Sequence, residues 1–496
     1  MLFHTWIFVL FFLIVYAVYL AAKRTRLREG WLLLASYVFY GWWNPRYLGL
    51  IVYATAVDYL AVVLMARTRR AWLRRLWLFV SVANTVLLLS QFKYVGFLVE
   101  SLNDLLAWVG LPYALSHPGV VWPIGFRAFT DLVAGAFRDL FAWLGWPVAV
   151  PPLGLVLPVG ISFFTFQSMS YTIDFYRGRI EKEPSFLRFA TFVSLFPQLV
   201  AGPIERAKNL LPQLRTERRI TAADVGDGLS LFVVGLFKKI ALADYLALYV
   251  DKVYAAPADC PAPALILATV AFAWQIYFDF SGYTDMARGV GRMMGFRLML
   301  NFNNPYLATS LGDFWQRWHI SLSTWFRDYV YIPLGGNRKG PARTYVNMFL
   351  TMVISGLWHG AAWTFVIWGT LHAVGRILTR RLEAGDFYKH RVPRIVKRLW
   401  VFVFVTFTWI FFRAQSLDDA WLIVTRIFTA AWSDPALPLL AAGLVAVTWA
   451  YQFVYESRAR RVLAGGPVRV ALVVAMLLYL ALVPGAEGQP FIYFQF

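Results

Sequence analysis

The sequence predicts an all-α protein that crosses a membrane many times, and three observations support this prediction. Hydrophobic residues make up 59% of the 496 residues and charged residues only 15%, whereas soluble domains carry about 25% charged residues. The mean hydropathy is +0.57. Long windows without charge alternate with clusters of Lys and Arg, as in multi-pass helical membrane proteins. A soluble globular fold is therefore excluded.

The formal net charge of +20 comes from 47 Lys and Arg residues against 27 Asp and Glu residues. In a soluble protein this excess would suggest a nucleic-acid partner. Here the basic residues cluster between apolar segments, which is what the positive-inside rule produces, so we expect no nucleic-acid partner. The single cysteine, Cys260, excludes an internal disulfide and any metal site built from several thiolates.

The first 22 residues contain no charged side chain and, as a helix, are long enough to cross the hydrocarbon core of a bilayer. The basic cluster at 23–28 follows this segment, so we interpret the segment as a retained anchor with its far end in the cytoplasm and not as a cleavable signal peptide. Further apolar segments, which with re-entrant pieces give about ten to twelve spans or half-spans, are 30–45, 47–66, 76–92, 229–237, 260–278, 400–412, 436–455 and 470–486.

Two irregular regions interrupt this series. Residues 117–154 are rich in proline around an amphipathic stretch at 125–146, which predicts an interfacial helix, and Pro158–Gly160 predicts a broken helix. Residues 177–220 form the longest basic zone, and the uncharged stretch 189–204 inside it predicts a shallow re-entrant hairpin on the cytoplasmic side. No composition shift or linker marks a domain boundary, so we expect one transmembrane domain over 1–496.

A charge-free window at 344–375 contains His359 and His372 and has basic clusters on both sides. It is either a hairpin that turns near His359 or one tilted span, and both place His359 deep in the membrane. A deep histidine with Gly356 and Gly360 beside it indicates a functional site. The alternative is an imidazole satisfied by a neighbouring carbonyl or carboxylate, which is the interpretation we favour for His372.

The segment 301–340 is too polar to face lipid and too aromatic for an exposed loop, so we expect it to line a buried cavity. An interfacial aromatic belt is the alternative. The two deep carboxylates before it could orient a histidine or neutralise Arg288 and Arg292. The candidate cavity-lining residues in and before this segment are Asp279, Asp285, Asn303, Trp315, Arg317 and His319.

Several familiar catalytic sites are missing from the sequence. It has no Gly-x-Ser-x-Gly elbow, no His-Glu-x-x-His zinc helix and no phosphate-binding loop of the Gly-x4-Gly-Lys type. We therefore expect no metal. Without an activated Ser or Cys, an imidazole general base that acts directly on an acceptor hydroxyl is the most economical chemistry.

These segments resemble signatures of the membrane-bound O-acyltransferase (MBOAT) family, and within it of the bacterial polysaccharide branch. The resemblance covers the chain from about residue 155 to its end, whereas the proline-rich insert departs from it. The matching segments are Leu157–Phe163, Phe196–Arg206, Asp279–Asp285, Arg317–Ser323, Trp358–Trp363 and Phe491–Phe496.

The resemblance implies a bundle of about eleven transmembrane helices with re-entrant segments around a central tunnel. By the same resemblance, His359 matches the active-site histidine of the family and His319 the second histidine of this branch. His359 would then act as the general base, with Trp358 or Arg317 stabilising the oxyanion. His319 could also be structural.

The implied activity is transfer of an acetyl group from a cytoplasmic donor, acetyl-CoA, to hydroxyls of an exported polysaccharide such as alginate. No permanently bound cofactor is expected. The expected setting is the bacterial inner membrane, with membrane lipids and periplasmic acetyltransferase proteins as partners. Two alternatives remain at this point: acyl transfer to another acceptor, such as a lipid, a teichoic acid or cellulose, and a non-catalytic transporter or export subunit.

Overall fold

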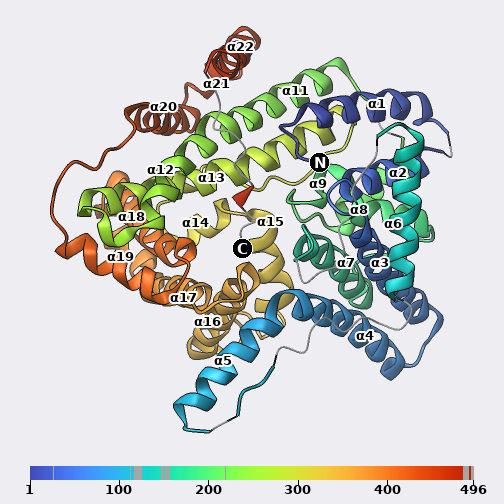
Figure 1. Cartoon of the computed structure of the whole chain (residues 1–496), viewed down its shortest axis with the longest axis horizontal. Helices are drawn as coiled ribbons and strands as arrows, with labels where there is room; N and C mark the ends of the chain where they lie inside the picture. Colours follow the sequence, from blue (N-terminus) through green and yellow to red (C-terminus); the bar gives the residue numbers. More distant parts are fainter. Residues whose placement is uncertain are drawn as a thin grey trace. The chain divides into compact units, whose positions relative to one another are not determined.

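The computed structural model describes residues 1–25, 27–111, 113–116, 126–146, 150, 157–217, 219–483 and 491–492. Every regular element in these ranges is helical (Figure 1), so the predicted all-α class is confirmed. The described residues form two compact units, 1–228 with 290–298, and 229–289 with 299–496. The expectation of a single domain stays a prediction.

The first unit is built around α3 (Leu48–Arg67), which packs against α4, α6, α7 and α8. Asp58 of α3 is buried and accepts hydrogen bonds from Ser81 of α4 and from Ser168 of α7. This one carboxylate therefore ties three helices together. The other helices of this unit are α1 (Trp6–Ala22), α2 (Leu27–Gly41), α4 (Ala71–Leu89), α5 (Val95–Trp108), α6 (Phe126–Trp143), α7 (Ile161–Tyr176), α8 (Phe186–Ser194), α9 (Phe196–Leu199) and α10 (Ala207–Arg215).

The amphipathic stretch of the insert forms α6, as predicted, and its apolar face is buried against α3 and the end of α2. Gly41 leaves room for Phe137, because a Cβ there would lie 2.6 Å from the Phe137 ring. The predicted helix break is also present, since α7 begins at Ile161 after Gly160, which has φ +75°. The prolines at 118, 123, 151 and 152 lie outside the described residues.

The basic zone contains three helices too short to cross a membrane, α8, α9 and α10, and a kink at Leu195 separates α8 from α9. Residues 189–199 are buried, whereas the first turn of α8 is partly exposed. Glu183 is fully buried and binds two cations of this zone, Arg188 and Arg215, each at 2.8 Å. Part of the basic charge is therefore neutralised inside the protein.

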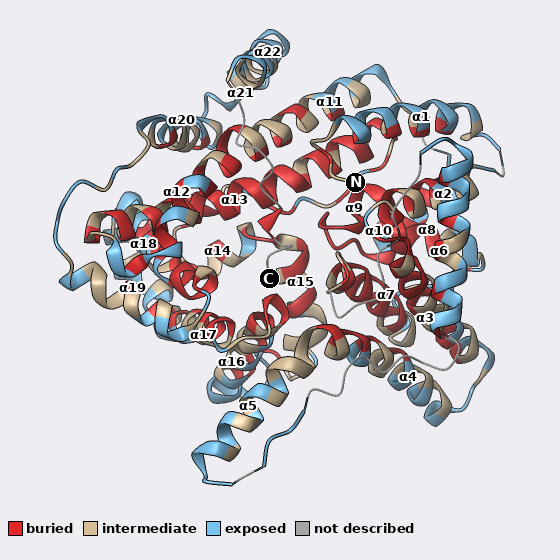
Figure 2. Ribbon diagram, viewed as in Figure 1, coloured by how far each residue is buried: buried red, intermediate tan, exposed pale blue. Residues whose placement is uncertain are grey.

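The second unit has α13 (Ala262–Met293) at its core, and α13 is coloured as buried along most of its length in Figure 2. Gly235 of α11 and Gly282 of α13 lie backbone to backbone, since a Cβ on either would come within 2.7 Å of the other's carbonyl oxygen. The other helices are α11 (Ala222–Phe237), α12 (Asp244–Ala255), α14 (Leu311–Arg317), α15 (Ile320–Phe326), α16 (Gly340–His359), α17 (Trp363–Ala384), α18 (Arg394–Arg413), α19 (Leu417–Thr429), α20 (Leu439–Tyr455), α21 (Arg460–Leu463) and α22 (Gly466–Leu482).

The window with the two deep histidines forms a helical hairpin and not one tilted span. α16 ends at His359, and α17 begins at Trp363 and packs along α16 (Figure 1). Gly356 and Gly369 make this contact possible, because a Cβ on Gly356 would lie 2.2 Å from the Phe365 carbonyl oxygen. The turn begins at Gly360, directly after His359, where the hairpin was predicted to turn.

Within the described ranges, four helical stretches are long and apolar enough to cross a membrane: Pro45–Arg67, Ala71–Trp108, Ala262–Met293 and Arg394–Arg413. Three apolar helices, α1, α20 and α22, are shorter, at 17 residues each. The structure thus supports a membrane protein, but it does not confirm about eleven spans. The difference arises because several predicted spans form helices of only 15 to 17 residues, namely α1, α2, α11, α20 and α22.

Candidate active site

His359 is the last residue of α16 and has only 5% of its surface exposed. Its ring centroid lies 5.0 Å from that of Trp358, 5.2 Å from that of Trp368 and 5.3 Å from that of Phe412. Three helices, α16, α17 and α18, therefore supply the aromatic wall around this imidazole. Gly360 follows directly, and a Cβ there would overlap the Phe365 ring at 2.0 Å.

His319 lies between α14 and α15 and is fully buried. Its backbone is in the left-handed region, with φ 40° and ψ 55°, a conformation that costs a non-glycine residue on the order of 1–3 kcal/mol. Two backbone hydrogen bonds bracket it, from Asn303 N–H to Arg317 O at 2.9 Å and from Ile320 N–H to Asn301 O at 2.8 Å. The surrounding chain thus enforces the unusual backbone.

Trp358 brings the two histidines to one place. Its ring centroid is 6.4 Å from that of His319 and 5.0 Å from that of His359, and the side chain is 4% exposed. The 301–340 segment and the α16–α17 hairpin are therefore adjacent at this indole. Two buried imidazoles that border one indole supply two proton-accepting groups and one N–H donor.

The two deep carboxylates are bound by cations and not by a histidine. Asp279 Oδ1 lies 3.0 Å from Lys239 Nζ, and Asp279 Oδ2 accepts the Ile492 backbone N–H at 2.7 Å. Asp285 pairs with Lys238 at 2.7 Å and with Arg288 at 3.2 Å. Of the two roles expected for these carboxylates, the structure shows charge neutralisation, although Lys238 and Lys239 are the principal partners.

The other candidate, Arg292, pairs with Asp224 and Asp227 in the first unit. It is therefore not a partner of Asp279 or Asp285 among the described residues.

Of the other predicted cavity residues, Trp315 is packed among aromatic rings, whereas Asn303 is exposed. Trp315 packs against His372 at 5.0 Å and Trp368 at 5.9 Å between ring centroids. Asn303 has an exposed side chain, and its backbone is what contacts Arg317.

The Arg317 guanidinium binds Asp313 at 2.7 Å and Glu456 at 2.6 Å. Burial acts to lower the pKa of Arg317, but the hydrogen bonds and charges of these two carboxylates outweigh burial and raise the pKa above its ordinary value. Arg317 therefore stays cationic, and its N–H groups are already engaged in holding the wall.

His372 is hydrogen-bonded through one of its two ring nitrogens, which agrees in part with the satisfied imidazole that we favoured from the sequence. It lies within α17 and is fully buried, and its Nε2 is 2.9 Å from Thr408 Oγ1 of α18. Trp368 and Phe404 pack on its ring at 4.9 and 5.8 Å. The partner is a hydroxyl and not the carbonyl or carboxylate expected.

The structure also adds residues that sequence reasoning missed. Asn301 is buried and its Oδ1 lies 3.0 Å from His319 Nδ1. Lys239 joins Asp279 to Asp244, and Trp368 and Phe412 complete the wall around His359. One signal was available for Lys239, because a lysine that continues an apolar run needs a buried carboxylate. Asn301 had no comparable signal, since asparagine is common in loops.

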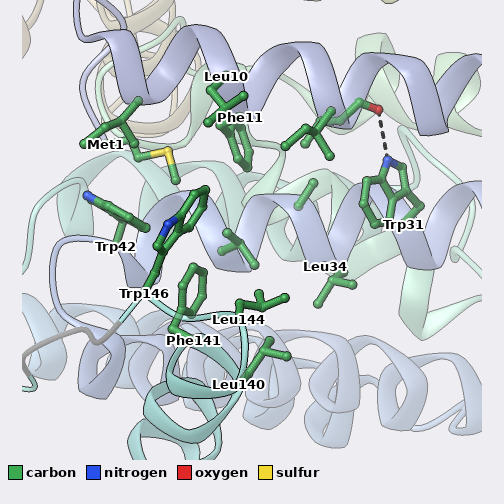
Figure 3. Close-up of a pocket in the computed structure, with 15 residues that line it drawn as sticks. Met1, Leu10, Phe11, Trp31, Leu34, Trp42, Leu140, Phe141, Leu144 and Trp146 are labelled. Carbon is green, nitrogen blue, oxygen red and sulfur yellow. Dashed lines mark hydrogen bonds between the residues drawn. The ribbon is translucent and has the colours of Figure 1, made fainter.

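The first unit contains a cavity of a different kind, with a volume of about 560 Å³ (Figure 3). It lies between α1, α2 and the end of α6, and apolar side chains such as Phe11, Leu34 and Phe141 point into it. The Trp31 indole N–H is turned to the Val15 carbonyl at 3.0 Å. Among the described residues that line this cavity, no side chain is an acid, a base or a nucleophile. Among the described residues, no group of three His, Cys, Asp or Glu side chains could hold a metal ion.

Comparison with known proteins identifies the family. The model of the MBOAT, membrane-bound O-acyltransferase family, matches residues 127–417. The chain is 38% identical over 434 residues to "Probable alginate O-acetylase AlgI" of Pseudomonas aeruginosa, covering 86% of this chain and 75% of that protein. The corresponding protein of Azotobacter vinelandii is also 38% identical over 434 residues, or 86% and 78% of the two chains.

A third relative, "Peptidoglycan O-acetyltransferase" of Helicobacter pylori, is 33% identical over 426 residues, which covers 80% of this chain and 73% of that protein. The family match spans the deep histidines, the α16–α17 hairpin and the 301–340 segment. The family that the sequence motifs indicated is therefore confirmed. The chain therefore belongs to the membrane-bound O-acyltransferase family and is an O-acyltransferase.

Proposed function

We propose that this protein transfers an acetyl group from acetyl-CoA to hydroxyl groups of an exported polysaccharide such as alginate. The observation that carries the proposal is the buried pair of histidines around Trp358 in a chain of this family. Similarity to proteins named alginate O-acetylase over most of the chain supports the acceptor class. The donor reaches the site from the cytoplasmic side, and the polymer is on the other side of the bacterial inner membrane.

In the proposed reaction, His359 is the general base. Its neutral imidazole takes the proton of the acceptor hydroxyl while that oxygen bonds to the thioester carbonyl carbon. The tetrahedral intermediate then expels the thiolate, which takes the proton back from His359 and leaves as a thiol. One C–O bond forms, one C–S bond breaks and the imidazole is regenerated.

The position of His359 at the end of α16 suits this cycle. The imidazolium that forms after proton transfer lies at a helix C-terminus, where the free carbonyl groups carry partial negative charge and stabilise a cation. For the oxyanion we assign the Trp358 indole N–H as the donor. Arg317 is less suited, because Asp313 and Glu456 already hold its guanidinium.

The experiment is acetyl transfer by membranes that contain the wild type or His359→Ala, with isotopically labelled acetyl-CoA and a panel of alginate, cellulose and peptidoglycan. We expect the wild type to label alginate and His359→Ala to lose on the order of 10²- to 10⁴-fold of that rate, because general-base catalysis contributes this much. His359→Ala should still insert normally, since alanine fits beside Gly356 and Gly360.

Each other outcome has a definite meaning. Labelling of peptidoglycan instead of alginate would favour the second acceptor, for which the 33% identity to the H. pylori enzyme is the specific support. Labelling at the wild-type rate by well-inserted His359→Ala would remove the assigned base. If transfer occurs only when periplasmic acetyltransferase proteins are added, the protein acts as the first member of a relay.

A further inference from the structure

Asn301 is a buried amide whose oxygen is surrounded by donors. Its side chain lies in the segment between α13 and α14 and is 1% exposed. Asn301 Oδ1 lies 3.2 Å from the Ser321 backbone nitrogen, 2.9 Å from Ser321 Oγ and 3.0 Å from His319 Nδ1. Three polar atoms from the start of α15 therefore converge on one oxygen.

The Ser321 backbone fixes which way the Asn301 amide faces. A backbone N–H can only donate, so the atom it meets must be the amide oxygen and not the NH2 group. An amide oxygen can only accept, so His319 Nδ1 must carry a hydrogen. In the neutral imidazole the proton is then on Nδ1, and Nε2 has the lone pair.

The surroundings of His319 preserve this tautomer. Three uncharged rings pack on it: Phe280 of α13 at 4.6 Å with its plane at 90°, Phe302 at 6.3 Å and Trp358 at 6.4 Å. The ionisable residues closest in sequence to Phe280 are Tyr277, Asp279 and Tyr283 of α13. The one closest to Trp358 is His359 of α16. Asp279 is held by Lys239 and Ile492, so no free carboxylate of α13 competes for the imidazole.

The backbone at His319 points to the same conclusion. A left-handed histidine persists only where its surroundings enforce it, and such positions cluster at functional sites. Here the enforcing contacts come from the residue pair 301 and 303, whose backbone brackets His319. One segment thus sets both the backbone conformation and the protonation of the ring.

We propose that Asn301 is a positioning residue that holds neutral His319 with its proton on Nδ1 and presents Nε2 as a hydrogen-bond acceptor for the acceptor sugar. A sugar carries several hydroxyls, so one can donate to His319 Nε2 while another gives its proton to His359. This inference rests on the proposed function, because it names how that site holds its acceptor.

Two variants of Asn301 test the inference. Asn301→Leu removes the acceptor oxygen, and we expect transfer to fall roughly 10- to 100-fold, the range for partners that orient a histidine, with most of the loss in KM for the polymer. Asn301→Asp keeps an acceptor at Nδ1 and adds a negative charge, which favours the imidazolium. The acidic limb of the pH–rate profile should therefore move to higher pH by about one unit or more, while transfer at high pH is largely retained.

The matched control is Ser321→Ala. It removes a hydrogen bond to the same oxygen but leaves the contact with His319, so transfer should stay within a few-fold of wild type and the acidic limb should not move. A purely structural role for Asn301 predicts that both Asn301 variants lower the melting temperature without moving the limb. If Asn301→Leu does not fold, the pH–rate profile of Asn301→Asp still tests the inference.

Two results would overturn the inference. In the first, Asn301→Leu folds and has the transfer rate and the pH–rate profile of the wild type. In the second, Asn301→Asp is active and the acidic limb of its pH–rate profile does not move. These failures are distinct from failure of the proposed function. If wild-type membranes acetylate no member of the acceptor panel, the proposed function is wrong. If wild type is active and the Asn301 variants match it, only the role of Asn301 is wrong.

Discussion

The regions around His319 and His372 look alike by burial but differ in backbone and in the ring atom that is bound. Both imidazoles are fully buried among aromatic side chains. His372 sits in regular α17, and its Nε2 faces Thr408 Oγ1, which itself donates to the Val405 carbonyl. His319 has a left-handed backbone, and its Nδ1 faces Asn301.

This difference separates a structural histidine from a candidate functional one. In His372 the bound ring atom is Nε2, which lies 2.9 Å from the Thr408 hydroxyl oxygen. Nε2 of His319 instead bears the lone pair, and His319 borders Trp358 next to His359. Burial alone does not distinguish a structural histidine from a functional one. The decisive features are which nitrogen is bound and whether the backbone is strained to place the ring.

The largest expected effect in this comparison belongs to His319. Asparagine tolerates the left-handed conformation, so His319→Asn should fold, yet it cannot titrate as an imidazole. If His319 is a catalytic partner, we expect acetyl transfer to fall by roughly 10²-fold or more. If His319 is only structural, His319→Asn should transfer at nearly the wild-type rate, whereas His319→Leu should be destabilised because Asn301 loses its partner and leucine is strained there.

Transfer rate and melting temperature, measured for both His319 substitutions, separate the two cases. Near-normal transfer in both variants would remove His319 from the site. His319 would then be a structural histidine, as we infer for His372.

Trp358→Phe sharpens the comparison by testing the residue that borders both histidines of the site. Phenylalanine keeps an aromatic ring but has no N–H, so a loss of about 10²- to 10³-fold in kcat is expected if the indole stabilises the oxyanion. KM for the donor should change little. Trp363→Phe, at the exposed start of α17, is the matched control. An unchanged kcat in Trp358→Phe would assign the oxyanion to another donor.

His372→Leu should give the smallest effect on transfer and a clear effect on stability. The substitution removes the hydrogen bond to Thr408, and one such bond contributes about 1 kcal/mol. We expect a lower melting temperature and transfer within about threefold of wild type. A loss comparable with that of His319→Asn would contradict the structural role of His372 and with it the comparison.

The helical class and the candidate histidines were predictable because they depend on local pattern. Apolar windows next to basic clusters marked α1, α3, α13 and α18, and the charge-free window around His359 marked the α16–α17 hairpin. The count of about eleven spans was not predictable to the same degree. An apolar window has the same hydropathy whether it crosses the membrane or forms two short buried helices, as α8 and α9 do.

The partners of the polar residues could not be predicted. The sequence offered Arg288 and Arg292 for the deep carboxylates, and Arg288 does pair with Asp285. Asp279, however, binds Lys239 and the backbone of Ile492, which is 213 residues away. Asn303 was the expected cavity residue, yet the side chain of Asn301 is the buried one. The last four residues of the terminal motif, 493–496, lie outside the described residues.

The helical class, the apolar character and the window that holds the buried His359 and His372 follow from the sequence alone, because hydropathy and charge act along the chain. Which atom meets each imidazole depends on the tertiary structure. Hydrogen bonds require distances near 3 Å and a fixed direction, and packing sets both between segments far apart in sequence. The tautomer of His319 is therefore a property of the fold, since it follows from where Ser321 turns the amide of Asn301.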